Sequence, residues 1–497
     1  MNIFRHYLLL IICSNVLLLV SGCTPKNVED GTTIGQFSAH LNERIPHLMD
    51  YYNIPGVCIA VVKNGTLKWS NAYGYADIEN EQPLTSGTIF RAESITKSVT
   101  AWGIMNLVER GKIALDDPVA NYLTRWEFHE SEFLQSNVTF RSVLSHSAGI
   151  NSAIYTDYPP DKPLPLLEDV LDGANGNPGT HIIQEPGISF LYSNPGFILL
   201  ELLTEEVTDT AFAGYMQSSI LTPLGMGNST FSFVEVNRSR ITSTYLLNGD
   251  AVPLQREAVK AHGGLYTTVD DLARFVTASV RSSEGQSPAN GVLSKASVKE
   301  LHTPVISTKS IYALVSDESG FGHFIEYLAT GQKAVSHGGQ GTGTITWMYQ
   351  IPETGDGVVI LTNSERSFRF IAQILRNWTQ WMGISPVGLS RLYSTVIPLV
   401  WILFISLCLL SAWLVWQTGN GLRLGRRTFA PFASRNIYTR SITGGFAVVI
   451  IGVSVSLSTH KMFLIFLPVL SGWLIPALIL FACILLAQTM FVRNTNS

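Results

Sequence analysis

Ser94 and Lys97 stand three positions apart at the start of an apolar-periodic run that continues to Arg110 and is followed by Gly111. The run predicts a helix that ends at the glycine, so the two side chains share one helix face. A serine hydroxyl is a weak nucleophile until a neighbouring base takes its proton. A lysine can be that base only where its surroundings keep it neutral, well below its usual pKa of roughly 10.4. The spacing therefore predicts a serine nucleophile with a lysine base, although this tetrapeptide pattern alone is weak evidence.

Two later segments could complete such a site. Tyr192 and Asn194 form a Tyr-x-Asn sequence. The stretch 336–340 reads Ser-His-Gly-Gly-Gln and leads into apolar runs that predict strands at 344–350 and 357–362. Taken alone, Tyr192 would be interpreted as a core aromatic residue with a satisfied hydroxyl. The order of the three motifs along the chain favours a role in chemistry.

This motif order resembles that of the serine β-lactamases and penicillin-binding proteins, whose signature is S-x-x-K, S-D-N and K-T-G. The Tyr-x-Asn form of the middle motif is similar to that of class C β-lactamases, D-aminopeptidases and related esterases. The resemblance runs from about Ile34 to Met382. It implies an α+β fold, with an antiparallel sheet flanked by helices, a helical lobe beside it and the active site between them. It implies no metal and no cofactor.

The resemblance also implies roles for the motif residues. Ser94 would be the acylated nucleophile, and Lys97 would accept its proton. Tyr192 would relay protons between the nucleophile, the leaving group and the hydrolytic water. Asn194 would hold Lys97 and the substrate amide.

The third motif would bind substrate. The backbone N–H groups of Ser94 and Gln340 would form an oxyanion hole, where one donor is typically worth about 2.7–4 kcal/mol. Gly338 and Gly339 would let the backbone approach the substrate closely. His337 replaces the lysine of K-T-G, so carboxylate anchoring and strong β-lactam turnover are in doubt. A free substrate carboxylate is expected to be handled better near pH 6, where His337 could protonate.

Other histidines and the cysteines add little chemistry. His146 belongs to a segment that is structural in the resembling family, so it is left out of the site, whereas His262 is left open as a residue that lines it. Cys58 lies alone in an apolar run and is expected to fill a buried strand. No cysteine or histidine spacing matches a metal site.

Charge is spread unevenly along the chain. Apolar residues make up 46% of it and charged residues only 14%. From Val396 to Ser497 there are 7 Lys or Arg residues and no Asp or Glu, whereas Cys23–Thr395 holds 25 basic against 37 acidic residues. A stretch this acidic lacks the basic footprint that nucleic acids require, so nucleic acid is not expected as a partner.

Both ends of the chain indicate a membrane. Residues 1–22 are typical of an export signal, and Cys23 completes a sequence that resembles a lipobox; an ordinary signal or an uncleaved anchor is the alternative. Three apolar segments, about 396–416, 442–458 and 462–491, predict transmembrane helices, with core helices as the alternative. The arginines between the first two place that loop in the cytoplasm and the preceding domain outside. The expected parts are therefore a signal, a hydrolase domain, a linker and a membrane domain, at 1–22, 23–382, 383–395 and 396–497.

A hydrolase domain followed by three membrane helices resembles the arrangement in the membrane peptidases of colibactin maturation, and in wall-associated relatives of penicillin-binding proteins. The leading hypothesis is a D-residue-specific peptidase or amidase that acts through an acyl-enzyme on peptidoglycan-type or capped natural-product peptides. Its expected partners are a small peptide or amide substrate and membrane lipid. The alternatives are an esterase of the same family and a β-lactam-binding sensor with little turnover.

Overall fold

The computed structural model describes residues 32–155, 157–176, 178–280, 288–434, 436–459 and 470–493. The expected signal at 1–22 and the lipidation site Cys23 lie outside these residues. The chain forms two compact units, one ending at Ser390 and the other running on from Arg391. Each unit is described separately below.

The first unit is built on an antiparallel sheet of nine strands in the order β3-β2-β1-β13-β12-β11-β10-β9-β8. Its long central strands are β1 (Gly56–Lys63), β2 (Thr66–Asp77), β11 (Lys333–Gly341), β12 (Thr344–Ile351) and β13 (Asp356–Thr362). The short strands are β3 (Gln82–Pro83), β8 (Ile306–Ser307), β9 (Glu318–Ser319) and β10 (Phe324–Tyr327). Every residue of β12 and β13 is buried, as expected for strands covered on both faces.

The β1–β2 hairpin follows directly from its turn residues. Asn64 and Gly65 have φ of +53° and +66°, the left-handed conformation that a two-residue hairpin turn requires. Cys58 is fully buried in β1, which confirms it as strand filler, and burial raises the pKa of its thiol.

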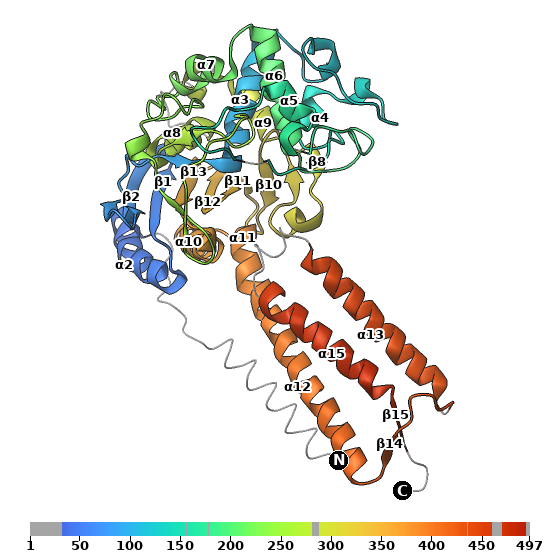
Figure 1. Ribbon diagram of the computed structural model, residues 1–497. Coiled ribbons are helices and arrows are strands. Elements are labelled where there is room, and N and C mark those ends of the chain that lie inside the picture. The colour runs from blue at the N-terminus through green and yellow to red at the C-terminus, as the bar shows by residue number, and fades with distance from the viewer. Residues whose placement is uncertain are drawn as a thin grey trace. The chain divides into compact units, whose positions relative to one another are not determined.

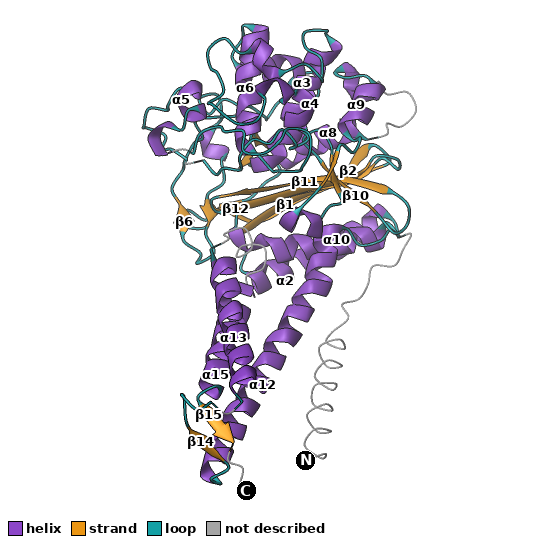
Figure 2. Ribbon diagram, turned by 90° about the vertical axis from the view of Figure 1, so that its right-hand side faces the viewer, coloured by secondary structure: helices purple, strands orange, loops and turns teal. Residues whose placement is uncertain are grey.

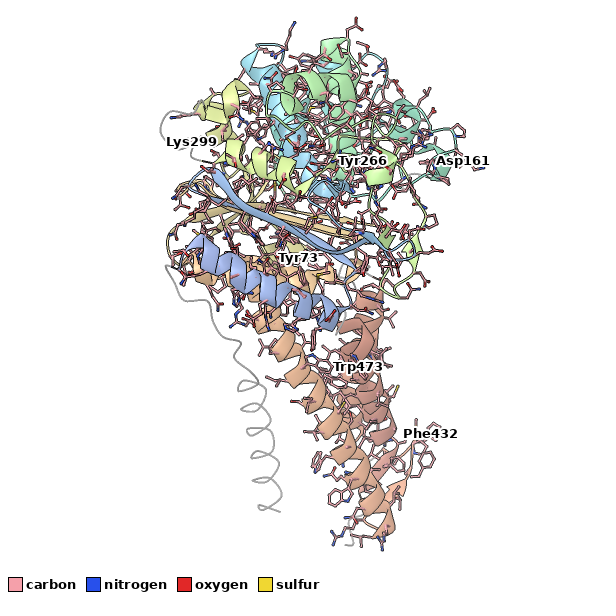
Figure 3. All side chains as sticks on the ribbon, turned by 90° about the vertical axis from the view of Figure 1, so that its left-hand side faces the viewer. Tyr73, Asp161, Tyr266, Lys299, Phe432 and Trp473 are labelled. Atoms are coloured by element: carbon pink, nitrogen blue, oxygen red, sulfur yellow. The ribbon has the colours of Figure 1, made fainter. Side chains whose placement is uncertain are left out.

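Helices cover both faces of the sheet (Figure 2). On one face α2 (Ile34–Tyr52) packs against α10 (Phe368–Trp381), with the rings of Phe37 and Trp381 stacked at 4.3 Å. Tyr73 of β2 also reaches α2, where its hydroxyl donates a hydrogen bond to Asn42 (Figure 3). The opposite face is covered by α8 (Val269–Ser279) and the helical lobe.

The helical lobe lies on the α8 side of the sheet (Figure 1). Its helices are α3 (Thr96–Glu109), α4 (Phe140–Leu144), α5 (Leu167–Leu171), α6 (Asn194–Thr208), α7 (Phe212–Met216) and α9 (Lys295–Leu301). Helix α3 is buried from Thr96 through Leu107, so it forms the centre of the lobe. It stops before Gly111, whose φ of +66° suits a glycine after a helix end.

The second unit is helical and apolar. It contains α12 (Ile397–Arg423), α13 (Ile437–Ser458) and α15 (Ile475–Gln488), together with a short β14–β15 pair (Arg427–Phe429 and Phe491–Arg493). Two helical segments, Gly388–Arg423 and Ile437–Ser458, are long and apolar enough to cross a membrane. The third expected span, 462–491, is described only from residue 470 and includes a shorter apolar helix, Gly472–Gln488. Where a linker was expected over 383–395, the chain is helical from Gly388 (α11, Gly388–Arg391) into α12.

Candidate active site

Ser94 lies on a single tight turn, Glu93–Ile95, that leads directly into α3. Glu93, immediately before it, has φ of +53°, a left-handed conformation that is uncommon for a residue with a side chain. The Glu93 carboxylate is held 2.6 Å from Arg91 Nε, and the Ala92 N–H donates to the Leu265 carbonyl at 2.7 Å. These two contacts hold the turn in its uncommon backbone conformation and so fix the position of Ser94.

Lys97 points back to Ser94 from the first turn of α3. Its Nζ lies 3.1 Å from Ser94 Oγ and donates to the His262 carbonyl oxygen at 2.7 Å. Lys97 is fully buried, and among the described residues no carboxylate pairs with it. Burial lowers the pKa of Lys97 to about 7, against the opposing pull of Glu257 and Glu93. A substantial fraction of this lysine is therefore neutral near pH 7 and able to accept a proton.

The backbone that receives Lys97 is fastened to two helices. The Thr100 hydroxyl of α3 donates to the Ala261 carbonyl at 2.8 Å. From α6, the buried Glu201 carboxylate accepts from the Ala261 N–H at 2.9 Å and pairs with Lys260 Nζ at 3.1 Å. His262, left open by the sequence, thus enters the site through its backbone oxygen.

Tyr192 completes the proton-transfer group. Its ring centroid lies 5.1 Å from Lys97 Nζ, and the Ser94 side chain is near enough to lower the pKa of its hydroxyl. Burial raises the pKa of Tyr192 more strongly than Ser94 lowers it, so Tyr192 remains a phenol near neutral pH. His146, which was left out of the site, packs its ring 4.4 Å from that of Tyr192 and accepts from the Ser193 N–H at 3.1 Å. His146 therefore packs against the Tyr192 ring and helps to hold it in position.

Asn194 is near the site but does not hold Lys97 as expected. Its amide nitrogen donates to the Ala153 carbonyl at 2.7 Å. Its Oδ1 is buried without a hydrogen-bond partner in the described part of the chain. This oxygen is free to accept from a substrate N–H.

Strand β11 runs against the turn that carries Ser94. A Cβ on Gly339 would lie 2.5 Å from the Ala92 carbonyl oxygen, and one on Gly338 would lie 2.5 Å from the Trp347 ring. Thr346 of the neighbouring strand also donates to the Ala92 carbonyl, at 2.8 Å. Glycine is therefore required for the close approach, and it brings the strand carrying Gln340 to the nucleophile.

His337 is buried among rings, and the structure contradicts its expected protonation near pH 6. It is 1% exposed, and its Nδ1 lies 2.7 Å from the Gly338 carbonyl oxygen, as a donor there. Burial lowers the pKa of His337 to about 3, with Lys97 as the next cause. Its Nε2 has no partner among the described residues. His337 is therefore neutral throughout the physiological range.

The rings beside His337 form what we term the aromatic wall, made of Tyr192, Phe190, Tyr312, Phe324 and His337. Tyr312 stacks on Tyr192 at 5.0 Å and on Phe324 at 5.4 Å, and Phe324 lies 5.1 Å from His337. Burial also raises the pKa of Tyr312 well above its usual value. The members of this wall are uncharged near pH 7.

A group of charged residues around Arg91 lies near Lys97 and was missed by sequence reasoning. The Arg91 guanidinium meets Asp157 through two hydrogen bonds of 2.9 and 3.0 Å, Glu93 at 2.6 Å and Glu257 at 3.9 Å. We term these four residues the Arg91 network. In the sequence, the Arg91 network is signalled locally only by Glu93, the acidic residue directly before Ser94.

A cavity of about 260 Å³ opens beside the nucleophile turn. It is lined by members of the Arg91 network, by Thr342 in the turn after β11 and by Thr344 at the start of β12. The cavity therefore lies next to both the turn that carries Ser94 and the end of the strand that approaches it.

Comparisons with known proteins agree with this geometry. The sequence model of the family described as Beta-lactamase matches residues 41–377. Penicillin-binding protein 4* of Bacillus subtilis (strain 168) is 23% identical over 356 residues, covering 68% of this chain and 74% of its own. The octameric penicillin-binding protein homologue from Pyrococcus abyssi superposes with a TM-score of 0.57 at 27% identity, covering 72% of this chain and 79% of its own.

A second solved structure extends the comparison to a carboxypeptidase. The beta-lactamase/D-alanine carboxypeptidase from Pseudomonas syringae has a TM-score of 0.55 at 17% identity and covers 69% of this chain and 99% of its own, a likeness of fold alone. Because the family match spans more than half of the sequence, this chain belongs to the beta-lactamase family, whose members include penicillin-binding protein homologues and are generally serine hydrolases.

Proposed function

We propose that this chain is a membrane-bound, extracytoplasmic serine hydrolase that cleaves amide bonds of D-residue-containing peptides through an acyl-enzyme. The observation that carries the proposal is the pair Ser94 Oγ and Lys97 Nζ at 3.1 Å, with Lys97 buried and its pKa lowered to about 7. A base with a pKa near the working pH is well matched to proton transfer.

The proposed chemistry uses these groups in turn. Ser94 attacks the substrate carbonyl while its proton passes to Lys97, and the oxyanion is held by the Ser94 and Gln340 N–H groups. Tyr192 then protonates the leaving group, and the acyl-enzyme remains on Ser94. Water activated through Tyr192 and Lys97 completes hydrolysis.

The two sides of the site suggest where the substrate lies. The cavity of about 260 Å³ beside Glu93 would receive the acyl portion, and the unpaired Asn194 Oδ1 would accept its amide N–H. The aromatic wall would receive the leaving group. Since His337 is neutral, an uncharged leaving group is favoured over one with a free carboxylate. Peptidoglycan-type and capped natural-product peptides are the proposed substrate pools.

An esterase is the second candidate, because an uncharged wall beside His337 suits an alcohol leaving group as well as an amine. The experiment compares matched D-aminoacyl amides and esters with the detergent-solubilised full chain and its Ser94→Ala variant. Amide hydrolysis that requires Ser94 supports the peptidase or amidase. Ester hydrolysis alone favours the esterase, and slow release of a penicillin probe without turnover of either favours a sensor.

Labelling tests the nucleophile independently of the substrate. A fluorophosphonate should modify wild-type protein at Ser94 only, and Ser94→Ala should abolish the signal. Labelling that persists in this variant would end the mechanism proposed here.

Membrane topology is a separate part of the proposal and rests on the arginine-rich loop after α12. A cytoplasmic reporter fused after Ser497 should be active, whereas one inserted at 459–461 should report the outside. The reverse pattern would overturn the proposed orientation.

A further inference from the structure

The side chain of Glu93 lies against strand β11 on both sides of Gln340. A Cβ on Gly339 would come 2.8 Å from Glu93 Cβ, and one on Gly341 would come 2.5 Å from Glu93 Oε2. The two glycines are separated by one residue of a strand, so they face the same side of the sheet. The Glu93 side chain therefore fills the space that side chains at these two positions would occupy.

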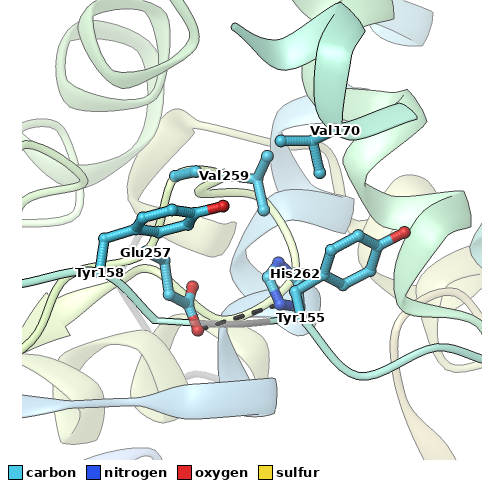
Figure 4. Close-up of a pocket in the computed structure, with 7 residues that line it drawn as sticks. Tyr155, Tyr158, Val170, Glu257, Val259 and His262 are labelled. Atoms are coloured by element: carbon cyan, nitrogen blue, oxygen red, sulfur yellow. Dashed lines mark ion pairs between the residues drawn. The ribbon is translucent and has the colours of Figure 1, made fainter. Parts of the chain in front are cut away.

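Glu93 is also held from the side away from β11. Arg91 Nε lies 2.6 Å from Glu93 Oε1, and Glu93 is only 4% exposed. The other two carboxyl groups of the Arg91 network have different contacts. Asp157 meets the guanidinium through two hydrogen bonds, and Glu257 lies 3.9 Å from His262 Nε2 at a separate cavity of about 10 Å³ (Figure 4). Glu93 thus contacts both Arg91 and β11.

The backbone joins this side chain directly to the nucleophile. Ser94 follows Glu93, whose φ of +53° is a conformation that persists only where the surrounding structure holds it. The pairing of β10 with β11 ends at Ser336, and the nucleophile turn lies against β11 beyond that point. The distance between the Ser94 and Gln340 backbones therefore depends on the Glu93 side chain, which fills the space between the turn and the strand.

We propose that Glu93 is a positioning residue of the oxyanion hole, whose side chain fixes the spacing between the backbone N–H groups of Ser94 and Gln340. This inference rests on the proposed acyl-enzyme mechanism. In this role Glu93 exchanges no proton and acts only through the two backbone groups.

The spacing matters because both N–H groups must reach the same oxygen. A donor stabilises the developing oxyanion when it lies about 2.7–3.1 Å from the position of that oxygen, and loss of one donor typically lowers kcat by about 10²–10³. A small displacement of β11 from the turn would withdraw the Gln340 donor and leave the nucleophile and its base in place. Variants of Glu93 should therefore lose oxyanion stabilisation and keep proton transfer.

The test compares a D-aminoacyl ester with its thionoester, in which sulfur replaces the carbonyl oxygen and accepts hydrogen bonds only weakly. Detergent-solubilised wild-type full chain should hydrolyse the oxygen ester faster. Glu93→Gly removes the side chain and suits the left-handed backbone. It should lower kcat for the oxygen ester by about 10²-fold and reduce the oxygen-to-sulfur ratio of kcat by at least about tenfold. Tyr192→Phe should slow both substrates alike and leave this ratio unchanged.

Paired substitutions place the effect at the contact with β11. Gly341→Ala adds a methyl group against the Glu93 carboxyl and should reduce the same ratio. In the Glu93→Gly background it should add little further loss, because the three atoms nearest that methyl position all belong to Glu93. Gly339→Ala is the matched control. Its Cβ would also lie 2.5 Å from the Ala92 carbonyl oxygen, so its loss should persist in both backgrounds.

Two further variants separate this role from charge and from general stability. Glu93→Gln keeps the size of the side chain and should keep the ratio near its wild-type value. Glu201→Gln alters another buried glutamate, which accepts from the Ala261 N–H near Lys97. It should lower the Tm and leave the ratio unchanged.

An unchanged ratio in Glu93→Gly would overturn the proposal, as would additive losses from Glu93→Gly and Gly341→Ala. A ratio as low in Glu93→Gln as in Glu93→Gly would assign the effect to charge and would overturn it too. If Glu93→Gly does not fold, Gly341→Ala alone decides, and an unchanged ratio in that variant refutes the spacing role. Wild-type protein that hydrolyses neither ester and is not labelled at Ser94 by a fluorophosphonate would instead refute the proposed function.

Discussion

The two groups of residues near Lys97 differ in charge: one consists of ionisable side chains around Arg91, and the other consists of uncharged rings. On one side, Arg91 is surrounded by Glu93, Asp157 and Glu257, all with side chains at most 13% exposed. On the other side, the aromatic wall presents stacked rings and a histidine whose pKa is about 3. The lysine that must gain and lose a proton lies between a strongly charged region and an uncharged one.

This contrast suggests a division of work. Burial lowers the pKa of Lys97, and Glu257 and Glu93 of the Arg91 network oppose that lowering. The residues of the aromatic wall do not titrate near neutral pH. They can therefore affect a substrate only through their shape and by excluding water from it. Variants on the two sides should therefore fail in different ways, and the predictions below use that difference.

The largest effect is expected at the proton-transfer groups between the two sides. Lys97→Ala and Tyr192→Phe should each lower kcat/KM by about 10²–10⁴, the usual contribution of a positioned acid or base. The measurement is steady-state hydrolysis of a D-aminoacyl amide, with labelling at Ser94 as a second readout. Near-normal turnover in either variant would move the general base elsewhere.

Arg91→Ala should be the most destabilising change on the charged side. It leaves three largely buried carboxyl groups without their shared cation, and breaking a buried pair typically costs about 3–5 kcal/mol. Arg125 offers a matched control, because it also contacts three glutamates, Glu168, Glu205 and Glu206, but its side chain is 44% exposed.

Arg125→Ala should cost no more than about 1 kcal/mol, since exposed ion pairs are screened by water. Denaturant unfolding of the solubilised protein, followed by tryptophan fluorescence, compares the two. Equal losses would show that burial does not distinguish the Arg91 network from an ordinary surface cluster.

Sequence reasoning succeeded where the determinants are local. The one-turn spacing of Ser94 and Lys97 places their polar atoms in contact, and Asn64-Gly65 forms the hairpin turn expected of it. The runs at 344–350 and 357–362 are the buried strands β12 and β13, because both faces of these strands are covered. In each case neighbouring residues suffice to determine the conformation.

It failed where distant segments meet. Arg91, Asp157 and Glu257 are far apart in the chain, and only the folded lobe brings them together. The burial that holds His337 neutral comes from Phe324 and Tyr192, which no motif spacing reports. Asn194 turns to Ala153 because that loop carbonyl lies within reach, so its expected contact with Lys97 is absent.

His337→Lys should produce a smaller, selective effect on the uncharged side. For wild-type protein the ratio of kcat/KM between an amidated D-residue substrate and its free acid should favour the amide and stay constant between about pH 5.5 and 8.5, because His337 does not titrate there. A lysine would add a positive charge and should shift the ratio toward the free acid by about tenfold, equivalent to about 1.4 kcal/mol. A wild-type ratio that changes near pH 6 would mean that His337 protonates and that the aromatic wall is not neutral.

The smallest effect is expected at Tyr312, which is linked to the chemistry only by its stacking on Tyr192. Its ring lies 5.0 Å from that of Tyr192 at an interplanar angle of 20°, and such aromatic pairs contribute about 0.5–1.5 kcal/mol beyond their buried area. Tyr312→Ala should therefore lower kcat/KM by about two- to tenfold, whereas Tyr312→Phe keeps the ring and should remain near wild type.

If the Tyr312 ring only lines the leaving-group side, the loss should appear in KM and grow with aromatic leaving groups. If it holds Tyr192 in place, kcat should fall equally for all substrates, and labelling at Ser94 should slow in parallel. If Tyr312→Phe loses as much activity as Tyr312→Ala, both interpretations are contradicted. The effect would then belong to the Tyr312 hydroxyl and not to its ring.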